Sequence, residues 1–284
     1  VHIAKKTGIM FVVAHVNYGL RGEDSIKDQI LVEKYAKKNN ILCETLVCDD
    51  VSSGNENTWR NVRYDFFVQM MQKHAATAIA VAHTTNDQAE TVLAHLLRGS
   101  GLQGLSGMSV CSVNRVIRPL LFIGREDVLS YCAENKVQYN IDKSNADNSF
   151  NRNKIRNELI PYIEQNFNEN IVNVLADTAR IIGDDYAFLQ KQNIVFWKNN
   201  SQKNSITFSA KKFLSKHPSV QRMALRAMIE ELNNTLVDVE SGFVEEMQKA
   251  IVSTKNKHQE VSRKNLKMLR KSDIVELTCL SSTN

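Results

Sequence analysis

The chain has 284 residues, which is enough for one large or two modest domains, and we predict two. Its 36 basic and 31 acidic residues give a net charge of +5, and residues 248–284 account for this excess with eight Lys or Arg against three Asp or Glu. No apolar run approaches the about twenty residues needed to span a bilayer, and the N-terminus lacks a signal-peptide core. We therefore predict a cytoplasmic protein without a membrane partner. The basic end suits either phosphate-backbone contact or a solubilising surface.

Five cysteines are scattered along the chain, and none forms a C-x-x-C pair. An odd, dispersed set of this kind supports neither a disulfide framework nor a zinc knuckle. We expect reduced thiols.

Apolar runs alternate with amphipathic stretches through the first half of the chain. This alternation predicts a doubly wound parallel sheet of the Rossmann-like α/β class, with Thr58 as an N-cap. The expected strands are residues 9–14, 41–48 and 78–82, and the expected helices are residues 24–39, 58–73 and a segment from about 87 to 98. Before them, VHIAKKTG resembles the last turn of a helix that Gly8 ends.

The second half is predicted to be mainly helical. We divide the chain into a catalytic domain (1–150), a helical linker (151–198) and a small, mostly α, basic domain (199–284). The expected helices are residues 125–135, 153–167, 171–197, 219–232 and 240–252; residues 140–156 form a polar, functional loop, 206–209 a strand and 266–277 a hairpin.

The turn after the third strand carries two carboxylates. Asp87 and Glu90 are three residues apart, so on a helix they share a face and can hold one cation or ammonium group. The same spacing is typical of a capping box, which Thr85 and Gln88 would also provide. On these residues alone, capping is the favoured interpretation.

A glycine-rich loop follows this helix and shifts the balance towards a ligand site. Four of the eleven glycines fall in residues 99–107, although one glycine is enough to end a helix. Backbone amides of such a loop can approach an anion closely, and Arg98 adds donors at its entry. We therefore predict that Arg98, Gly99 and Gly101 contribute to a nucleotide pocket.

Three further clusters are predicted near the same sheet edge. His15, Asn17 and Arg21 lie in HVNYGLRG directly after the first strand. Arg60 and Arg63 lie three apart on a helix, which suits anion binding or a solvated face. Arg152 and Arg156 lie four apart at the start of another helix.

Together these residues resemble the tRNA(Ile)-lysidine synthetases, which are members of the PP-loop ATP pyrophosphatase group. The resemblance covers roughly residues 8–165 through six motifs in order. They are AHVNYGLRG, WRNVRYDF, AHTTNDQAET, RGSGLQGLSGM, IRPLL and SNADNSFNRNKIRNELIP. The last hundred or so residues resemble the family only in layout, as a long helix and a small domain that would grip tRNA.

The resemblance implies a two-step modification of the wobble cytidine in the CAU anticodon of an isoleucine tRNA. ATP, with Mg²⁺, adenylates the cytosine C2 oxygen, and free L-lysine then displaces AMP. By the same resemblance, Asp87 and Glu90 hold the lysine ammonium and Arg63 contacts phosphate. Arg152 and Arg156 lie near the nucleotide and RNA, while His15, Asn17 and the 99–107 loop line the ATP pocket and the path of the flipped cytidine. A homodimer is left open.

The chain departs from the family because the Ser-Gly-Gly-x-Asp-Ser loop of the group is absent. We expect a fragment that lacks the first strand, this loop and most of the first helix, and that alone binds ATP weakly and turns over little.

Three alternatives remain at this point. A PP-loop tRNA thiolase would need reactive cysteines or an iron–sulfur site, which the cysteine spacing does not supply. A non-catalytic RNA-binding remnant would have lost its phosphate loop and kept its basic tail. An amidotransferase-type synthetase would carry a glutaminase domain.

Overall fold

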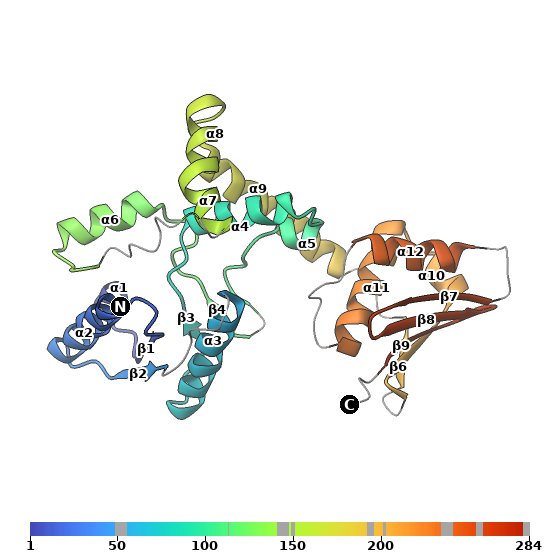
Figure 1. Cartoon of the computed structure of the whole chain (residues 1–284), viewed down its shortest axis with the longest axis horizontal. Coiled ribbons are helices and arrows are strands. Elements are labelled where there is room, and N and C mark those ends of the chain that lie inside the picture. Colours follow the sequence, from blue (N-terminus) through green and yellow to red (C-terminus); the bar gives the residue numbers. More distant parts are fainter. Residues whose placement is uncertain are drawn as a thin grey trace. The chain divides into compact units, whose positions relative to one another are not determined.

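A computed structural model describes residues 1–48, 56–112, 114–140, 148, 151–191, 196–200, 203–233, 241–253 and 258–280. The chain forms two compact units (Figure 1). The first unit comprises Val1–Ala94 and Gly107–Ala179, and the second comprises His95–Ser106 and Arg180–Asn284. None of the described helices is long and apolar enough to cross a membrane.

Parallel strand pairs form the framework of the first unit. Strand β1 (Val13–Asn17) pairs with β2 (Cys43–Val47), and β3 (Ile79–Ala80) pairs with β4 (Val116–Ile117), both in parallel. Helix α2 (Glu23–Lys38) provides the crossover between β1 and β2, α3 (Glu56–Lys73) connects β2 to β3, and α1 (His2–Lys6) ends before Gly8 as predicted. The predicted α/β class with parallel strands is confirmed. The strands are short, and within the described residues they form two separate pairs.

Two local predictions in this unit are wrong. Strand β1 begins at Val13 rather than at residue 9, because its pairing with β2 starts at Val13 and Cys43 while Met10 is 97% exposed. His15 and Asn17 therefore lie within the strand instead of after it. Helix α3 begins at Glu56, so Thr58 lies inside the helix and is not its N-cap.

Helices from the middle of the chain follow. They are α4 (Thr85–Leu97), α6 (Arg125–Glu134), α7 (Asn151–Lys154), a π-helical turn (Ile155–Leu159), α8 (Ile160–Asn166) and α9 (Ile171–Gln190). Of these, α4 and α9 begin in the first unit and end in the second. Ala89 and Leu93 of α4 pack with Ile155 and Ile160 in a small core. Helix α9 ends at Gln190, so the predicted helix 171–197 is too long and Trp197 lies outside the observed helix. Of the predicted polar loop 140–156, residues 141–147, 149 and 150 lie outside the described residues.

The glycines after α4 have local structural causes. Gly99 ends α4 with a φ of +72°, which favours glycine, and short helix α5 (Leu102–Leu105) follows. A Cβ on Gly104 would lie 2.5 Å from the Cβ of Ser100. The Gly107 backbone adopts a φ of +61°, and a Cβ there would lie 2.7 Å from Oε1 of Gln88. That Gln88 amide donates to the Met108 carbonyl and accepts from the Met108 amide.

Substituting Gly107→Ala is expected to destabilise the first unit by about 1–3 kcal/mol, because the new methyl group meets Gln88 and the backbone adopts a positive φ. Urea unfolding followed by circular dichroism measures this change. Gly101→Ala is the matched control, since Gly101 has no positive φ and no atom within 4 Å of its added Cβ. Equal effects of the two substitutions would contradict the steric argument.

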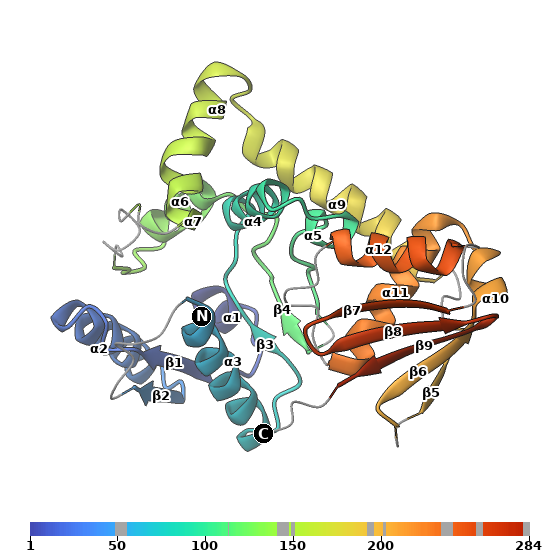
Figure 2. The ribbon, with the colours of Figure 1, turned by 45° about the vertical axis from the view of Figure 1, so that its right-hand side comes forward.

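The second unit is built on a five-stranded antiparallel sheet. The strand order is β5 (Lys198–Asn200), β6 (Ser205–Ser209), β9 (Ile274–Cys279), β8 (Leu266–Lys271) and β7 (His258–Arg263). Helices α10 (Ala210–Leu214), α11 (Pro218–Asn233) and α12 (Ser241–Val252) accompany it (Figure 2). Leu225, Met228, Met247, Met268 and Leu277 are fully buried in its core.

This unit is α + β rather than mostly α. The predicted hairpin at residues 266–277 is confirmed as β8 and β9, which turn at Ser272, and the predicted strand at 206–209 is confirmed as β6. Strand β7 was not predicted, because its HQEVSR sequence is mainly polar and leaves only Val261 buried.

Candidate active site

Helix α4 begins with a cap that involves one of the two carboxylates. Oδ2 of Asp87 accepts hydrogen bonds from the backbone amide of Thr84 at 2.8 Å and from its hydroxyl at 2.9 Å. The capping interpretation is therefore correct for Asp87, although its partner is Thr84. Thr85 instead donates to the Leu121 carbonyl, and Gln88 holds Met108. The cap leaves Oδ1 of Asp87 available for other contacts.

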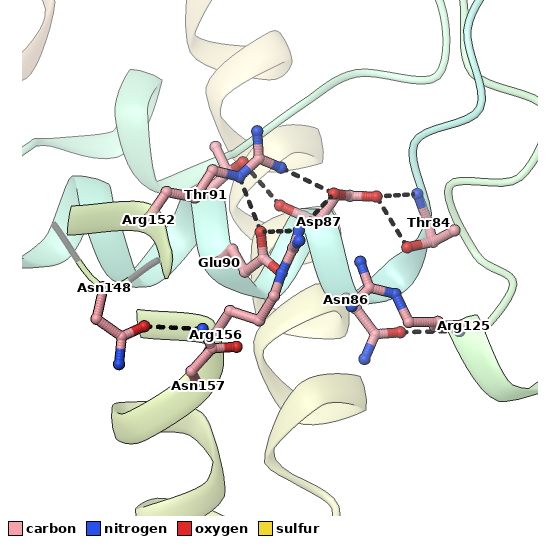
Figure 3. A network of polar contacts seen from close by, with 10 residues as sticks. All are labelled: Thr84, Asn86, Asp87, Glu90, Thr91, Arg125, Asn148, Arg152, Arg156 and Asn157. Carbon is pink, nitrogen blue, oxygen red and sulfur yellow. Dashed lines mark hydrogen bonds and ion pairs between the residues drawn. The ribbon is translucent and has the colours of Figure 1, made fainter. Parts of the chain in front are cut away.

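Two arginines meet the carboxylates of α4 (Figure 3). Arg152 donates from Nε to Glu90 Oε2 and from Nη2 to Asp87 Oδ1, both at 2.8 Å. Arg156 donates to both oxygens of Glu90, at 2.6 and 2.9 Å, and contacts Asp87 Oδ1 at 3.4 Å. The structure thus brings together four residues that the sequence placed in separate motifs. We call Asp87, Glu90, Arg152 and Arg156 the ion-pair cluster.

The local sequence around Arg156 explains how this side chain reaches α4. Ile155 and Ile160 are 5% and 7% exposed and pack against Ala89 and Leu93 on the same helix that carries Glu90. The turn between them is π-helical, a geometry frequent at functional sites. Burial of these isoleucines therefore holds the arginine-bearing segment against the carboxylates.

The electrostatics of the ion-pair cluster are those of a largely buried site. The Glu90 side chain is 1% exposed and that of Asp87 is 15% exposed. Burial alone would raise the pKa of Asp87, but the hydrogen bonds from Thr84 and the charges of Arg152 and His83 outweigh it and lower the pKa. A carboxylate held in this way stays ionised and is suited to bind a cation.

The predicted residues of β1 form a second group with helix α2. Asn17 is buried; it donates to Gln29 at 2.8 Å and accepts from the Gly19 amide at 2.8 Å. Arg21 pairs with Asp28 at 2.6 Å. Burial lowers the pKa of His15, and the charges of Asp28 and Glu33 oppose this effect. These contacts shape the connection between β1 and α2.

Helix α3 contributes arginines that surround an aromatic ring. Arg60 and Arg63 lie 4.9 and 5.8 Å from the centre of the Tyr64 ring. Arg63 also lies beside Tyr18, where burial raises the pKa of the phenol and the arginine opposes the rise. The structure therefore groups Arg63 with the end of β1.

Arg98, Gly99 and Gly101 belong to the second unit. The amides of Gly99 and Ser100 donate to carbonyls of α4, and those of Gly104, Leu105 and Ser106 donate to carbonyls of the loop itself. Much of the loop's donor capacity is therefore used within the loop and α4.

Sequence reasoning missed two residues at the ends of β3 and β4. His83 follows β3, and its Nδ1 is buried with no partner among the described residues. Arg118 follows β4 and is 8% exposed; it donates to the Ser109 carbonyl, while its Nε is equally without a described partner. Buried polar atoms without partners are uncommon and point to a ligand or water. His83 is the second residue of the motif AHTTNDQAET, a signal that could have identified it.

His83 is expected to titrate far below an ordinary histidine. Burial lowers its pKa from 6.5 to about 4; the charge of Asp87 opposes this shift, while Arg118, Arg152 and Arg60 reinforce it.

Because the unfolded chain binds a proton near pH 6.5 and the folded chain does not, stability should fall as the pH drops from about 6.5 to about 4. We expect about 1–2 kcal/mol, reduced from the full shift because the ring is partly exposed. Nuclear magnetic resonance titration of the His83 ring measures the pKa, and His83→Gln should remove this part of the pH dependence. An ordinary pKa would contradict the description.

Comparison with known proteins then assigns the family. A family model described as a PP-loop domain matches residues 1–163. The chain belongs to the PP-loop family. Among curated proteins it is 33% identical over 244 residues to the tRNA(Ile)-lysidine synthase of Clostridium tetani, covering 83% of this chain and 52% of that protein. It is 28% identical over 285 residues to the tRNA(Ile)-lysidine synthase of Clostridioides difficile, covering 97% of this chain and 62% of that protein. The chain therefore spans roughly half to three fifths of the length of these relatives.

A solved structure supports the fold. The U34-tRNA thiolase NcsA from Methanococcus maripaludis, which carries a [4Fe-4S] cluster, matches with a TM-score of 0.51 and 13% identity. The match covers 64% of this chain and 66% of the thiolase chain. At this identity the similarity concerns the fold alone, and it agrees with the PP-loop assignment.

Proposed function

We propose that this PP-loop protein takes part in ATP-dependent ligation of lysine to C2 of the wobble cytidine in an isoleucine tRNA with a CAU anticodon, which gives lysidine. The observation that carries this proposal is the 33% identity over 244 residues to a tRNA(Ile)-lysidine synthase, together with the PP-loop domain over residues 1–163. The chain covers 52% of that relative. We place the reaction in the cytoplasm.

The reaction has two steps. The C2 oxygen of cytosine attacks the α-phosphorus of ATP, a P–O bond forms, and pyrophosphate leaves. The side-chain ammonium of lysine then loses a proton and the neutral amine attacks C2. The C2–O bond breaks, AMP leaves with the oxygen, and the nitrogen bonded to C2 gives up a second proton. Both steps need negative charge on phosphate to be stabilised, and the second also needs the amine to be held beside C2.

Asp87 and Glu90 are assigned to the lysine ammonium because they lie on one face of α4, the Glu90 side chain is buried, and hydrogen bonds and neighbouring charges lower the pKa of Asp87. Arg152 and Arg156 approach the same point, which would place their guanidinium groups beside the adenylate phosphate as well. Arg63 is assigned to a phosphate contact, and His15, Asn17 and Arg21 to the nucleotide pocket. Arg98, Gly99 and Gly101 lie in the second unit, and their assignment to a nucleotide pocket stays a prediction.

Magnesium would be bound chiefly by the phosphates of ATP, as is usual for nucleotide enzymes. Among the described residues, no group of three or more His, Cys, Asp or Glu is arranged to hold a metal ion.

The tRNA is assigned in part to the second unit. Strands β7 and β8 and the turn between them carry Arg263, Lys264, Lys267, Arg270 and Lys271. Such a concentration of basic residues favours contact with a phosphate backbone and should make tRNA affinity fall with rising salt.

The test is incorporation of radiolabelled L-lysine into a transcript of the isoleucine tRNA, using the protein as its complete gene encodes it, with ATP and Mg²⁺. Label should enter the RNA with release of AMP and pyrophosphate in equal amounts. A transcript with guanosine at the wobble position is the control and should stay unlabelled. Incorporation of sulfur instead of lysine would replace the proposal with a thiolase, and RNA binding without either reaction would identify a non-catalytic RNA-binding protein.

A further inference from the structure

The subsite assigned to the lysine ammonium already contains positive charge. Arg152 and Arg156 contact Asp87 and Glu90 at 2.6 to 3.4 Å (Figure 3). A guanidinium and an ammonium both donate hydrogen bonds to carboxylates, so they compete for the same oxygens. Lysine and these two arginines therefore have overlapping binding partners.

The charges of the ion-pair cluster balance, with two carboxylates and two guanidinium groups. Glu90 is 1% exposed, so solvent does little to screen an added charge. A third cation would leave one buried positive charge without a counterion, which is strongly unfavourable. An ammonium can enter only when one guanidinium gives up its carboxylate contacts.

Arg152 is the residue better suited to leave. Its side chain is 34% exposed, against 15% for Arg156, so it can be hydrated with less rearrangement. Arg152 donates one hydrogen bond to each carboxylate, whereas Arg156 donates two hydrogen bonds, from two nitrogens, to Glu90. Arg156 also directly follows Ile155, which is buried in the core against α4.

His83 provides an independent hydrogen-bonding group near Asp87. It lies four residues before Asp87, and it is close enough for the two charges to interact. Its Nδ1 is buried and has no partner among the described residues. An ammonium has three donors, of which two carboxylates take two, so a neutral imidazole is a suitable third acceptor.

We propose that Arg152 is an internal competitor, which occupies the ammonium subsite on Asp87 and Glu90 until L-lysine displaces it. The inference rests on the proposed function, because it takes these carboxylates as the lysine subsite. Without lysine, Arg152 neutralises the buried carboxylates. With lysine bound, the ammonium replaces it and the balance of charge is preserved.

Equilibrium dialysis with radiolabelled L-lysine tests this exchange without requiring turnover. The Arg152→Ala variant should bind lysine about threefold to tenfold more tightly than the wild type, as expected if Arg152 fills the subsite about 70–90% of the time. Arg152→Gln, which keeps much of the side chain's length but removes its charge, should change affinity in the same direction. Lys154→Ala is the matched control, since it removes an exposed cation from the same helix α7, and its affinity should equal that of the wild type.

A second measurement on the wild type covers the case in which the variants fold poorly. Adding L-lysine should shift the Arg152 Nε–H resonance, whereas norleucine, which has the same chain without the amine, should not. Unchanged or weaker lysine binding by both folded Arg152 variants would overturn the competitor role, while wild-type binding would leave the proposed function standing. If no lysine binds to the wild type and none enters tRNA, both the inference and the proposed function are wrong.

Discussion

Replacing Glu90 with Gln is expected to destabilise the first unit by about 2–4 kcal/mol, because Arg152 and Arg156 would lose the buried charge that both contact. Glutamine has the same shape, so the loss measures charge and hydrogen bonding rather than packing. Both arginines are partly exposed and can regain some hydration, which keeps the expected cost below that of a fully buried pair. Urea unfolding, followed by circular dichroism, gives the free energy.

The control for this experiment is Glu23→Gln in the first turn of α2. That side chain is 91% exposed and lies 3.8 Å from Lys27, so its loss should change stability by less than about 0.5 kcal/mol. A Glu90→Gln variant that unfolds at the same urea concentration as the wild type would show that the buried pairing contributes nothing to stability.

Replacing Asp87 with Asn is expected to raise the KM for lysine by about tenfold to a hundredfold while the KM for ATP changes much less. A hydrogen bond to a charged group contributes about 1.5–3 kcal/mol, and the substitution removes the charge from the side of the subsite next to Thr84. Steady-state kinetics with each substrate varied in turn separates the two effects.

Asp87 also caps α4, so a loss of capping has to be distinguished from a loss of lysine binding. Asp127 provides the control, because its carboxylate accepts the Gly124 amide at 3.2 Å at the start of α6, in the same capping role. Asp127→Asn should reduce stability slightly and leave the lysine KM unchanged. Equal increases in the KM for lysine and for ATP in Asp87→Asn would remove the assignment of Asp87 to lysine.

The sequence predicted the carboxylate pair and the arginine pair of the ion-pair cluster, but it did not predict the contact between the two pairs. Spacing of three residues is enough to place Asp87 and Glu90 on one face of a helix, and spacing of four does the same for Arg152 and Arg156. Contact between the pairs spans 62 to 69 residues, and no local pattern encodes such a distance. Only the packing of Ile155 and Ile160 on α4 brings them together.

Other differences between the predicted and the observed elements arise where contacts between distant segments determine the structure. The apolar residues before Val13 are as β-forming as those after it, so only the register with β2 locates the strand. Strand β7 has a single buried residue, Val261, and is recognisable only when β8 lies beside it. His83 is not part of a periodic sequence pattern. It is noticed only in the folded chain, where its buried Nδ1 has no hydrogen-bond partner among the described residues.

The π-helical turn at Ile155–Leu159 makes the length of this segment as important as its composition. Each residue added to or removed from a helix rotates everything beyond it by about 100°. If one residue were deleted here, two outcomes are possible. If Arg156 kept its contact with Glu90, Ile160 would rotate away from α4; if Ile160 stayed packed on α4, Arg156 would lose its contact with Glu90. Substitutions on the outer surface of this segment should be accepted far more readily than insertions or deletions of a single residue.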